Sequence, residues 1–172
     1  MAILDLAGAN QSTVSFITGY GHRLYSDDFL LQLDRRFGEG DFYENQCDPG
    51  ARQEFLDNAL DFPEEHFDGA LVWDVLEYLS APMLTAVVKR LHQMLRPDAG
   101  LLAVFHADER AETVSSYSYR IHNHRTIEMA PRGRRRPAQI FNNRSLEKLF
   151  QDFQSVKFFL TRDHLREVIV RR

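Results

Sequence analysis

The stretch FDGALVWDVLEYLSAP at residues 67–82, followed by LHQMLRPDAGLLAVFH at residues 91–106, is the part of the chain that decides its fold. Residues 67–73 and 101–105 are almost entirely apolar, which predicts two buried strands. Between them, apolar residues recur at three- and four-residue spacing and predict a helix over 81–95. The spaced residues are Leu84, Val87, Val88, Leu91 and Leu95. A strand, a helix and a strand in this order are typical of neighbouring parallel strands joined by a crossover helix.

The same alternation extends toward the N-terminus. Residues 2–7 and 22–28 predict strands, and residues 12–20 and 29–37 predict helices that end at glycines. The segment 41–58 shows no clear pattern, but the alternation requires a third strand ending near residues 57–59. We therefore predict one α/β domain over residues 1–172, a three-layer sandwich around a mostly parallel seven-stranded sheet whose last strand is antiparallel.

The last third of the chain has a different pattern. Residues 110–137 are expected to form an insertion that contains a half-exposed strand at 117–129 and an arginine-rich loop at 131–137. Ser145 is expected to cap a helix whose apolar residues, Leu146, Leu149, Phe150 and Phe153, follow helical spacing. The strands 156–160 and 165–170 are then expected to close the sheet as a hairpin.

Composition excludes several classes of protein. The 172 residues are 44% hydrophobic and 27% charged, as in ordinary globular domains, and the length suits a single domain. No apolar run is long enough to cross a bilayer. The single cysteine, Cys47, can form neither an internal disulfide nor a cysteine-rich zinc site. The first ten residues carry Asp5 and no basic region, so no secretory signal is expected and the predicted compartment is the cytoplasm.

Charge is distributed unevenly along the chain. The first 109 residues carry 7 Lys and Arg against 19 Asp and Glu, whereas residues 110–172 carry 14 against 6. Two interpretations follow from this asymmetry. The basic third can attract an anionic partner such as nucleic acid, with the loop Arg132–Arg136 on the phosphates. It can also be a basic face that pairs with the acidic two-thirds of the same domain.

Candidate binding residues follow each predicted strand. Ligands of open parallel sheets bind beyond the carboxyl ends of the strands. The first strand leads through the small residues of 7–10 to the start of a helix, where backbone N–H groups favour anionic ligand groups. The residues that follow the second to fifth strands are Asp27, Asp28, Asp57, Asn58, Asp74 and His106. We expect these groups to share one edge of the sheet.

This order resembles class I S-adenosylmethionine-dependent methyltransferases, which share an FD–strand–D-x-L-E-x-L segment and an L-R-P-x-G turn. The resemblance runs from Ile3 to the closing hairpin and implies a Rossmann-like fold with S-adenosylmethionine as cofactor. By position, Asp28 or Asp27 would hold the ribose hydroxyls, Asp57 and Asn58 would meet the adenine, and Asp74 would lie beside the transferring methyl. The loop around the methionine part of the cofactor would correspond to Asp5, Ala7, Gly8 and Asn10.

Two features depart from the pattern of that family. The family has acid-x-Gly-x-Gly-x-Gly, but here only Gly8 is present, and Ala7 adds a methyl group where the backbone would meet the ligand. The chain also starts at the first strand, without the helices that cover the substrate pocket in the family. We therefore expect an open acceptor site, a pocket completed by a partner or by a preceding segment, or a protein that has lost turnover.

Methyl transfer mainly requires that the acceptor be held in line with the methyl group, and an oxygen or nitrogen acceptor can also need a base. His106 is the best-placed candidate base, with a hydrogen-bonded scaffold histidine as the alternative. Tyr117 and Tyr119 either line an acceptor pocket or pack as ordinary sheet residues. The acceptor, a small molecule or a macromolecule, is not specified by the sequence.

Other chemistries have weaker signals. His122, His124 and Glu128 supply too few donors for a metal site, and we predict no metal. The G-x-G-x-x-G motif of nicotinamide dehydrogenases is absent. Three functions stay open: an active methyltransferase, a binding or regulatory module that keeps the fold without turnover, and a nucleic-acid-binding protein that uses the basic third of the chain.

Overall fold

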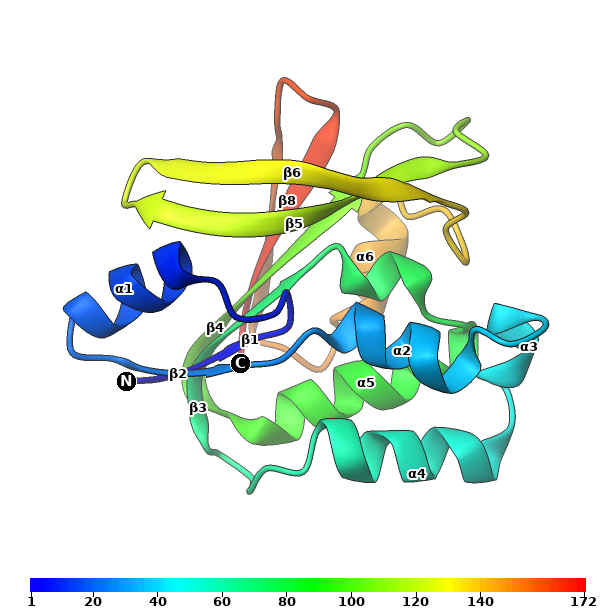
Figure 1. The fold of residues 1–172 in the computed structure, drawn as a ribbon, viewed down its shortest axis with the longest axis horizontal. Coiled ribbons are helices and arrows are strands. Elements are labelled where there is room, and N and C mark those ends of the chain that lie inside the picture. Colours follow the sequence, from blue (N-terminus) through cyan, green and yellow to red (C-terminus); the bar gives the residue numbers. More distant parts are fainter.

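A six-stranded sheet forms the centre of the computed structural model, which describes residues 1–172 (Figure 1). Its strand order is β2-β1-β3-β4-β8-β7. The strands are β1 (Ala2–Asp5), β2 (Arg23–Ser26), β3 (Phe67–Trp73), β4 (Leu95–His106), β7 (Ser155–Leu160) and β8 (Leu165–Arg171). The first four are parallel, and β8 runs antiparallel to both β4 and β7. The predicted α/β architecture and the closing hairpin are confirmed.

Helices cover both faces of the sheet unequally (Figure 1). On one side lie α2 (Phe29–Phe37), α4 (Pro49–Ala59), α5 (Ala81–Met94) and α6 (Asn143–Leu149), whereas α1 (Gln11–Gly19) lies on the other. The main core of 34 buried residues is built around the first group. No helix has the length and apolar character that a membrane span requires.

The predicted third strand is wrong. Residues 42–59 instead form the short helix α3 (Phe42–Asn45) and α4, which leaves six strands in the sheet rather than seven. Asp41 and Asp48 act as N-caps, since their carboxylates accept backbone N–H groups of the first turn. Pro49 follows at the first helical position, where its missing N–H costs nothing. These capping signals were present in the sequence and outweigh the alternation of strands and helices.

The predicted single strand at 117–129 is two strands. β5 (Val114–Asn123) and β6 (Thr126–Arg135) pair antiparallel as a separate hairpin that lies across the carboxyl ends of the parallel strands (Figure 1). The side chain of Asn123 accepts the N–H of Arg125 and fixes the turn. The predicted arginine-rich loop at 131–137 therefore belongs largely to β6. Because both strands alternate polar and apolar residues, their joined pattern imitates one long strand.

The last helix also begins differently from the prediction. Asn142, not Ser145, is the N-cap of α6: its side chain accepts the N–H of Ser145. The hydroxyl of Ser145 in turn accepts the N–H of Asn142, which completes a capping box. Both residue types are good caps, and the sequence alone did not separate them.

Candidate functional site

A cavity of about 430 Å³ opens at the carboxyl ends of β1 and β2. Its walls are three short segments: Ala7–Asn10 after β1, Ser26–Asp28 after β2, and Ser118–Arg120 of β5. We call it the strand-end cavity. Its volume lies within the range of about 300–1,000 Å³ that is typical of small-molecule sites. Two of these walls contain residues that the sequence predicted for the site, whereas the third comes from the hairpin.

Asp5, the last residue of β1, precedes the loop that walls the cavity and is 1% exposed. Its carboxylate accepts hydrogen bonds from Ala7 N at 3.1 Å, Ser26 Oγ at 3.2 Å and Trp73 Nε1 at 2.7 Å. Burial raises the pKa of Asp5 above its ordinary value, and these hydrogen bonds oppose the rise. The carboxylate of Asp5 therefore holds the loop, β2 and β3 together and does not line the cavity.

Trp73 is the last residue of the apolar strand β3, and its pattern in the sequence indicates no further role. Its backbone has φ of 57°, a left-handed conformation that is uncommon outside glycine. Its indole stacks on the ring of Tyr119 with centroids 4.5 Å apart and planes 11° from parallel. Trp73 thus connects Asp5 below it to the hairpin above it. The only sequence signal was an aromatic residue with a polar N–H at the end of a strand.

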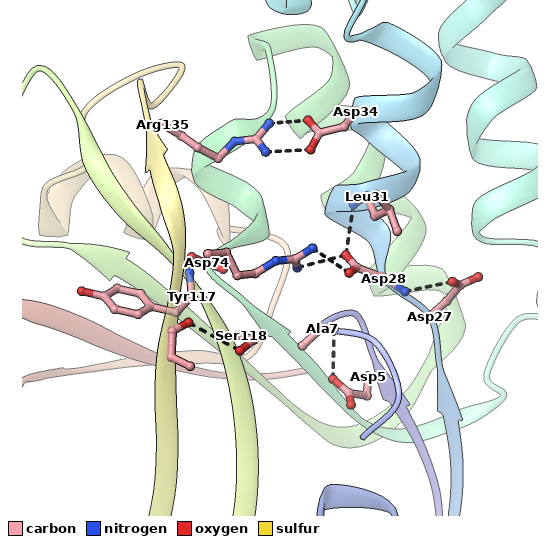
Figure 2. Close-up of polar contacts among 12 residues, drawn as sticks. Asp5, Ala7, Asp27, Asp28, Leu31, Asp34, Asp74, Tyr117, Ser118 and Arg135 are labelled. Atoms are coloured by element: carbon pink, nitrogen blue, oxygen red, sulfur yellow. Dashed lines mark hydrogen bonds and ion pairs between the residues drawn. The ribbon is translucent and has the colours of Figure 1, made fainter. Parts of the chain in front are cut away.

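Asp28 has a structural role in addition to its place in the cavity wall. It caps α2 through its bond from Leu31 N at 3.0 Å, and both of its oxygens receive the guanidinium of Arg132, at 3.2 and 2.8 Å (Figure 2). Asp27 is exposed, and its Oδ1 accepts only the N–H of Asp28. Of the two predicted ribose-binding carboxylates, Asp27 is thus the one not held by an arginine.

Gly8 is required by the geometry of the loop. Its φ is +87°, and a Cβ at this position would lie 3.1 Å from the Cβ of Asp28. Ala7 forms an isolated bridge with Asp28, which draws the two walls together. The one glycine kept in the loop is therefore the one that the close approach of Asp28 demands.

Strand β5 contacts the start of α1, where the predicted cofactor loop ends. Asn10 caps α1 by accepting Thr13 N, and its Nδ2 donates to Tyr119 O at 3.1 Å. Ser12 Oγ donates to Ile121 O at 2.9 Å, and Ile121 N donates to Thr13 Oγ1 at 3.0 Å. These bonds fix the hairpin against the loop and the helix N-terminus.

A second group of polar side chains lies under the hairpin, beyond β3 and β4. Glu77, on the 3₁₀ helix η1 (Val75–Tyr78), accepts both His106 N and His106 Nδ1 at 2.6 Å. Asp74 precedes η1, is 3% exposed and accepts Tyr117 N at 3.2 Å (Figure 2). The sequence predicted Asp74 and His106 near each other but missed Glu77, whose only signal was its place in the D-x-L-E motif.

Burial governs the protonation of this group. Desolvation raises the pKa of Asp74 to about 7. Burial alone would lower the pKa of His106, but its bond to Glu77 and the charges of Glu77 and Asp74 raise it overall. Tyr78 and Tyr119 have hydroxyls that are buried without a hydrogen-bond partner, and burial raises the pKa of both. Tyr119 lines the strand-end cavity, and the ring of Tyr117 stacks on His106.

Glu77→Gln is expected to lower the pKa of His106. The variant keeps the shape of the side chain but removes the carboxylate that favours the imidazolium. A histidine whose pKa is raised in the folded state stabilises the fold at pH values below its unfolded pKa, near 6.5. This stabilisation is lost as the pH rises through the folded pKa. The contribution of His106 to the free energy of unfolding is therefore smaller in the variant. An NMR titration of the His106 ring measures the shift. Glu112→Gln, in the exposed segment before β5, is the matched control, and an unchanged His106 pKa in Glu77→Gln would contradict the assignment.

The predicted adenine-binding pair lies elsewhere. Asp57 and Asn58 are on the last turn of α4, where Asp57 accepts Gln53 Nε2 and Asn58 donates to Glu54 O. Neither residue lines the strand-end cavity. Asn58 instead shares a smaller hollow of about 210 Å³ with Asp27, between β2 and α4. The missing third strand explains the displacement, because the prediction placed both residues at its carboxyl end.

The arginines of β6 are used mainly within the domain. Arg135 pairs with Asp34 on α2 at 2.5 and 2.8 Å (Figure 2). Arg132 pairs with Asp28, and Arg134 donates to Thr113. This geometry favours the second interpretation of the charge asymmetry, in which the basic third pairs with the acidic part of the same domain. His122 contacts Glu128, and no group of three His, Cys, Asp or Glu side chains could hold a metal ion.

Comparisons with known proteins identify the fold. No family model matches the chain, and no curated protein matches it. Among solved structures, it is similar to the 1,6-didemethyltoxoflavin-N1-methyltransferase of Burkholderia thailandensis, crystallised with 1,6-didemethyltoxoflavin and S-adenosylhomocysteine. The TM-score is 0.54 at 16% identity, over 99% of this chain and 70% of the other.

Two further structures are S-adenosylmethionine-dependent methyltransferases of archaea. The one from Archaeoglobus fulgidus has a TM-score of 0.57 at 8% identity, over 99% of this chain and 86% of the other. The one from Methanosarcina mazei has a TM-score of 0.51 at 16% identity, over 99% and 92%. The chain therefore has the Rossmann-like fold of these methyltransferases, as the sequence resemblance implied.

Proposed function

We propose that the protein is an S-adenosylmethionine-dependent methyltransferase whose cofactor binds in the strand-end cavity. The observation that carries the proposal is the position of the cavity: it lies at the carboxyl ends of two neighbouring parallel strands and is walled by the loop after β1 and the acidic turn after β2. In this class of sheet, that edge is where nucleotide-like ligands bind. The fold shared with methyltransferases supports the same assignment.

The residues around the cavity fit such a cofactor in three respects. Gly8 provides a wall without a side chain, at a point where a Cβ would meet Asp28. The start of α1 presents the positive end of a helix dipole toward anionic groups. The exposed Asp27 carboxylate can accept ribose hydroxyls, as acidic residues after strands do in this class of site. Asp28 is the second such carboxylate, once Arg132 no longer holds it.

The bound cofactor would supply a sulfonium methyl group, which is already a good electrophile. The protein must therefore position an acceptor and, for an O–H or N–H acceptor, remove its proton. Glu77 fixes the ring of His106 through Nδ1, so the remaining ring nitrogen, Nε2, is the one that can exchange a proton with the acceptor. Nε2 is buried without a hydrogen-bond partner, and an acceptor must displace the residues that cover it. Asp74 and His106 lie beneath the hairpin, so we place the acceptor between the parallel strand ends and β5.

Titration with S-adenosylhomocysteine, the unreactive product, tests the proposal. Isothermal calorimetry is expected to show saturable one-to-one binding. Asp27→Asn should weaken it by about tenfold to 150-fold, because a hydrogen bond to a charged carboxylate is worth about 1.5–3 kcal/mol. Asp48→Asn, which removes an equivalent carboxylate at the N-cap of α4, should leave the affinity unchanged. No saturable heat at millimolar ligand in the wild-type protein would remove the proposal.

A specific observation favours a second candidate, a domain that keeps this fold without turnover. The hairpin engages Asp28, Asp74 and Asn10, three of the predicted site residues, in contacts within the chain. The two candidates differ in an assay with methyl-labelled S-adenosylmethionine and a panel of phenols, amines, peptides and nucleic acids. Labelled product identifies the methyltransferase. Binding of S-adenosylhomocysteine without transfer to any acceptor favours the domain without turnover.

A further inference from the structure

The β5–β6 hairpin is held over the strand ends by its own set of contacts. β6 contributes the paired bonds of Arg132 to Asp28 and of Arg135 to Asp34 (Figure 2). β5 contributes bonds through the backbone of Tyr117, Tyr119 and Ile121. Residues 114–135 include five arginines and a single acidic residue, Glu128. Three of the side chains that they contact on the rest of the domain are acidic: Asp28, Asp34 and Asp74. Electrostatic attraction therefore favours the closed position of the hairpin.

We propose that the hairpin is a lid on the strand-end cavity and that Arg132 is its latch. The latch consists of the bidentate ion pair with Asp28, and a ligand whose hydroxyl groups bind Asp28 must first displace the guanidinium. This inference rests on the proposed function for the identity of the ligand. The closed lid itself is a property of the chain without any ligand and is tested separately.

The position of Asp28 is what makes Arg132 the latch rather than one contact among several. Asp28 belongs to the cavity wall, and its two oxygens are already shared among Leu31 N and the two guanidinium nitrogens. A sugar hydroxyl must therefore compete with a charged donor for the same carboxylate. Arg135, by contrast, pairs with Asp34 away from the cavity wall, so a ligand in the cavity does not compete with it.

Two connections join the hairpin to the rest of the domain. Residues 107–113 lead to it from β4, and residues 136–142 lead from it to α6; both segments lack helix and strand. Backbone bonds from Ala107 N to His164 O and from Ala138 N to Glu77 O fix the two connections to the domain, so opening must take place between these points. The Arg132 and Asp28 side chains are 30% and 24% exposed. This partial exposure lets salt and solvent weaken the pair, so opening should be easier at high ionic strength.

Hydrogen–deuterium exchange without ligand tests the lid. The reporters are the amides of Tyr117 and Ile121, which donate to Asp74 and Thr13 on the rest of the domain. Arg132→Ala should raise their exchange rates about tenfold, since a bidentate charge-assisted pair is lost. Asp28→Asn should do the same, because asparagine preserves the cap of α2 but not the ion pair. Arg134→Ala is the control: the same residue type on the same strand, bonded only to Thr113.

Titration of S-adenosylhomocysteine tests the latch. Arg132→Ala should bind this ligand about tenfold more tightly than the wild-type protein, because the binding-competent open state is more populated and Asp28 is free. Adding Asp28→Asn to Arg132→Ala should reverse the gain. Arg134→Ala should bind as the wild-type protein does.

The two experiments separate the two proposals. Unchanged exchange in both Arg132→Ala and Asp28→Asn overturns the lid, whatever the ligand does. The latch is overturned if exchange rises but Arg132→Ala binds S-adenosylhomocysteine no more tightly than the wild-type protein does. Raised exchange with no binding to wild type or variant supports the lid and overturns only the proposed function.

Discussion

Trp73→Ala is expected to lower the free energy of unfolding by about 4 kcal/mol, the middle of the range for truncating a buried tryptophan. Trp73 is 1% exposed and belongs to a small core between the sheet and the hairpin, with Val104, Tyr119, Ile121 and Leu165. Its truncation empties the space between the sheet and β5 and leaves Tyr119 without its stacking partner. Urea unfolding at constant pH, followed by circular dichroism, measures the change.

Trp73→Phe separates packing from hydrogen bonding. Phenylalanine keeps an aromatic ring against Tyr119 but removes the N–H that bonds Asp5 Oδ1. Asp5 is buried, so the lost donor should cost about 1–3 kcal/mol. A loss in Trp73→Ala no larger than that in Trp73→Phe would show that the stacked ring does not hold the hairpin, contrary to our expectation.

The parts of the fold that the sequence predicted best are those in which every local signal agrees. The strand at 67–73 and the helix at 29–37 have the predicted bounds. In the helix, apolar residues at 29, 30, 33 and 37 form one face, and Gly38 follows directly. Tertiary packing does not oppose this pattern, so local sequence preference and tertiary structure favour the same helix.

The strand predicted near residue 57 shows the opposite case. That prediction rests on the order of neighbouring elements, whereas the Asp48-Pro49 pair is a local signal for the start of a helix. Without that strand, β2 is the edge of the sheet, and α4 lies beside it. Asp57 and Asn58 therefore lie on α4 and not at the carboxyl end of a strand, where the prediction placed them.

The site was only partly predictable because its decisive contacts join distant segments. Asp27, Asp28 and Gly8 could be placed from the edge rule for parallel sheets. Arg132 lies 104 residues from Asp28 in sequence, and Glu77 lies 29 residues from His106. The charge asymmetry indicated that the basic third can pair with the acidic part of the domain, but charge counts do not specify which residues meet. The docking of the hairpin on the sheet determines which residues meet, and this docking depends on the shape of the whole edge of the sheet.

Asp74→Asn should make the protein more stable at neutral and higher pH, with a gain of up to about 4 kcal/mol that disappears in acid. The figure follows from the rise of the Asp74 pKa from 3.8 to about 7, at 1.36 kcal/mol for each pKa unit. Below pH 4 the carboxyl is protonated in both states and costs nothing. Between pH 4 and 7 the unfolded chain ionises first, so the free energy of unfolding falls as the pH rises.

Above pH 7 Asp74 is ionised in both the folded and the unfolded state, and the free-energy cost of burying its carboxylate stays constant. Asparagine has no such cost, and its side-chain oxygen can still accept the N–H of Tyr117. Urea unfolding at pH 4, 6 and 8 should therefore show a difference between variant and wild type that grows with pH. Asp57→Asn, at an exposed position on α4, should show no such growth. The charges that face Asp74 are Glu77 and His106. Combining Glu77→Gln with Asp74→Asn measures how much of the stability gain depends on the interaction between Asp74 and Glu77. A gain that is equal at all three pH values would mean that Asp74 ionises normally in the folded protein, so that it is not the buried acid described here.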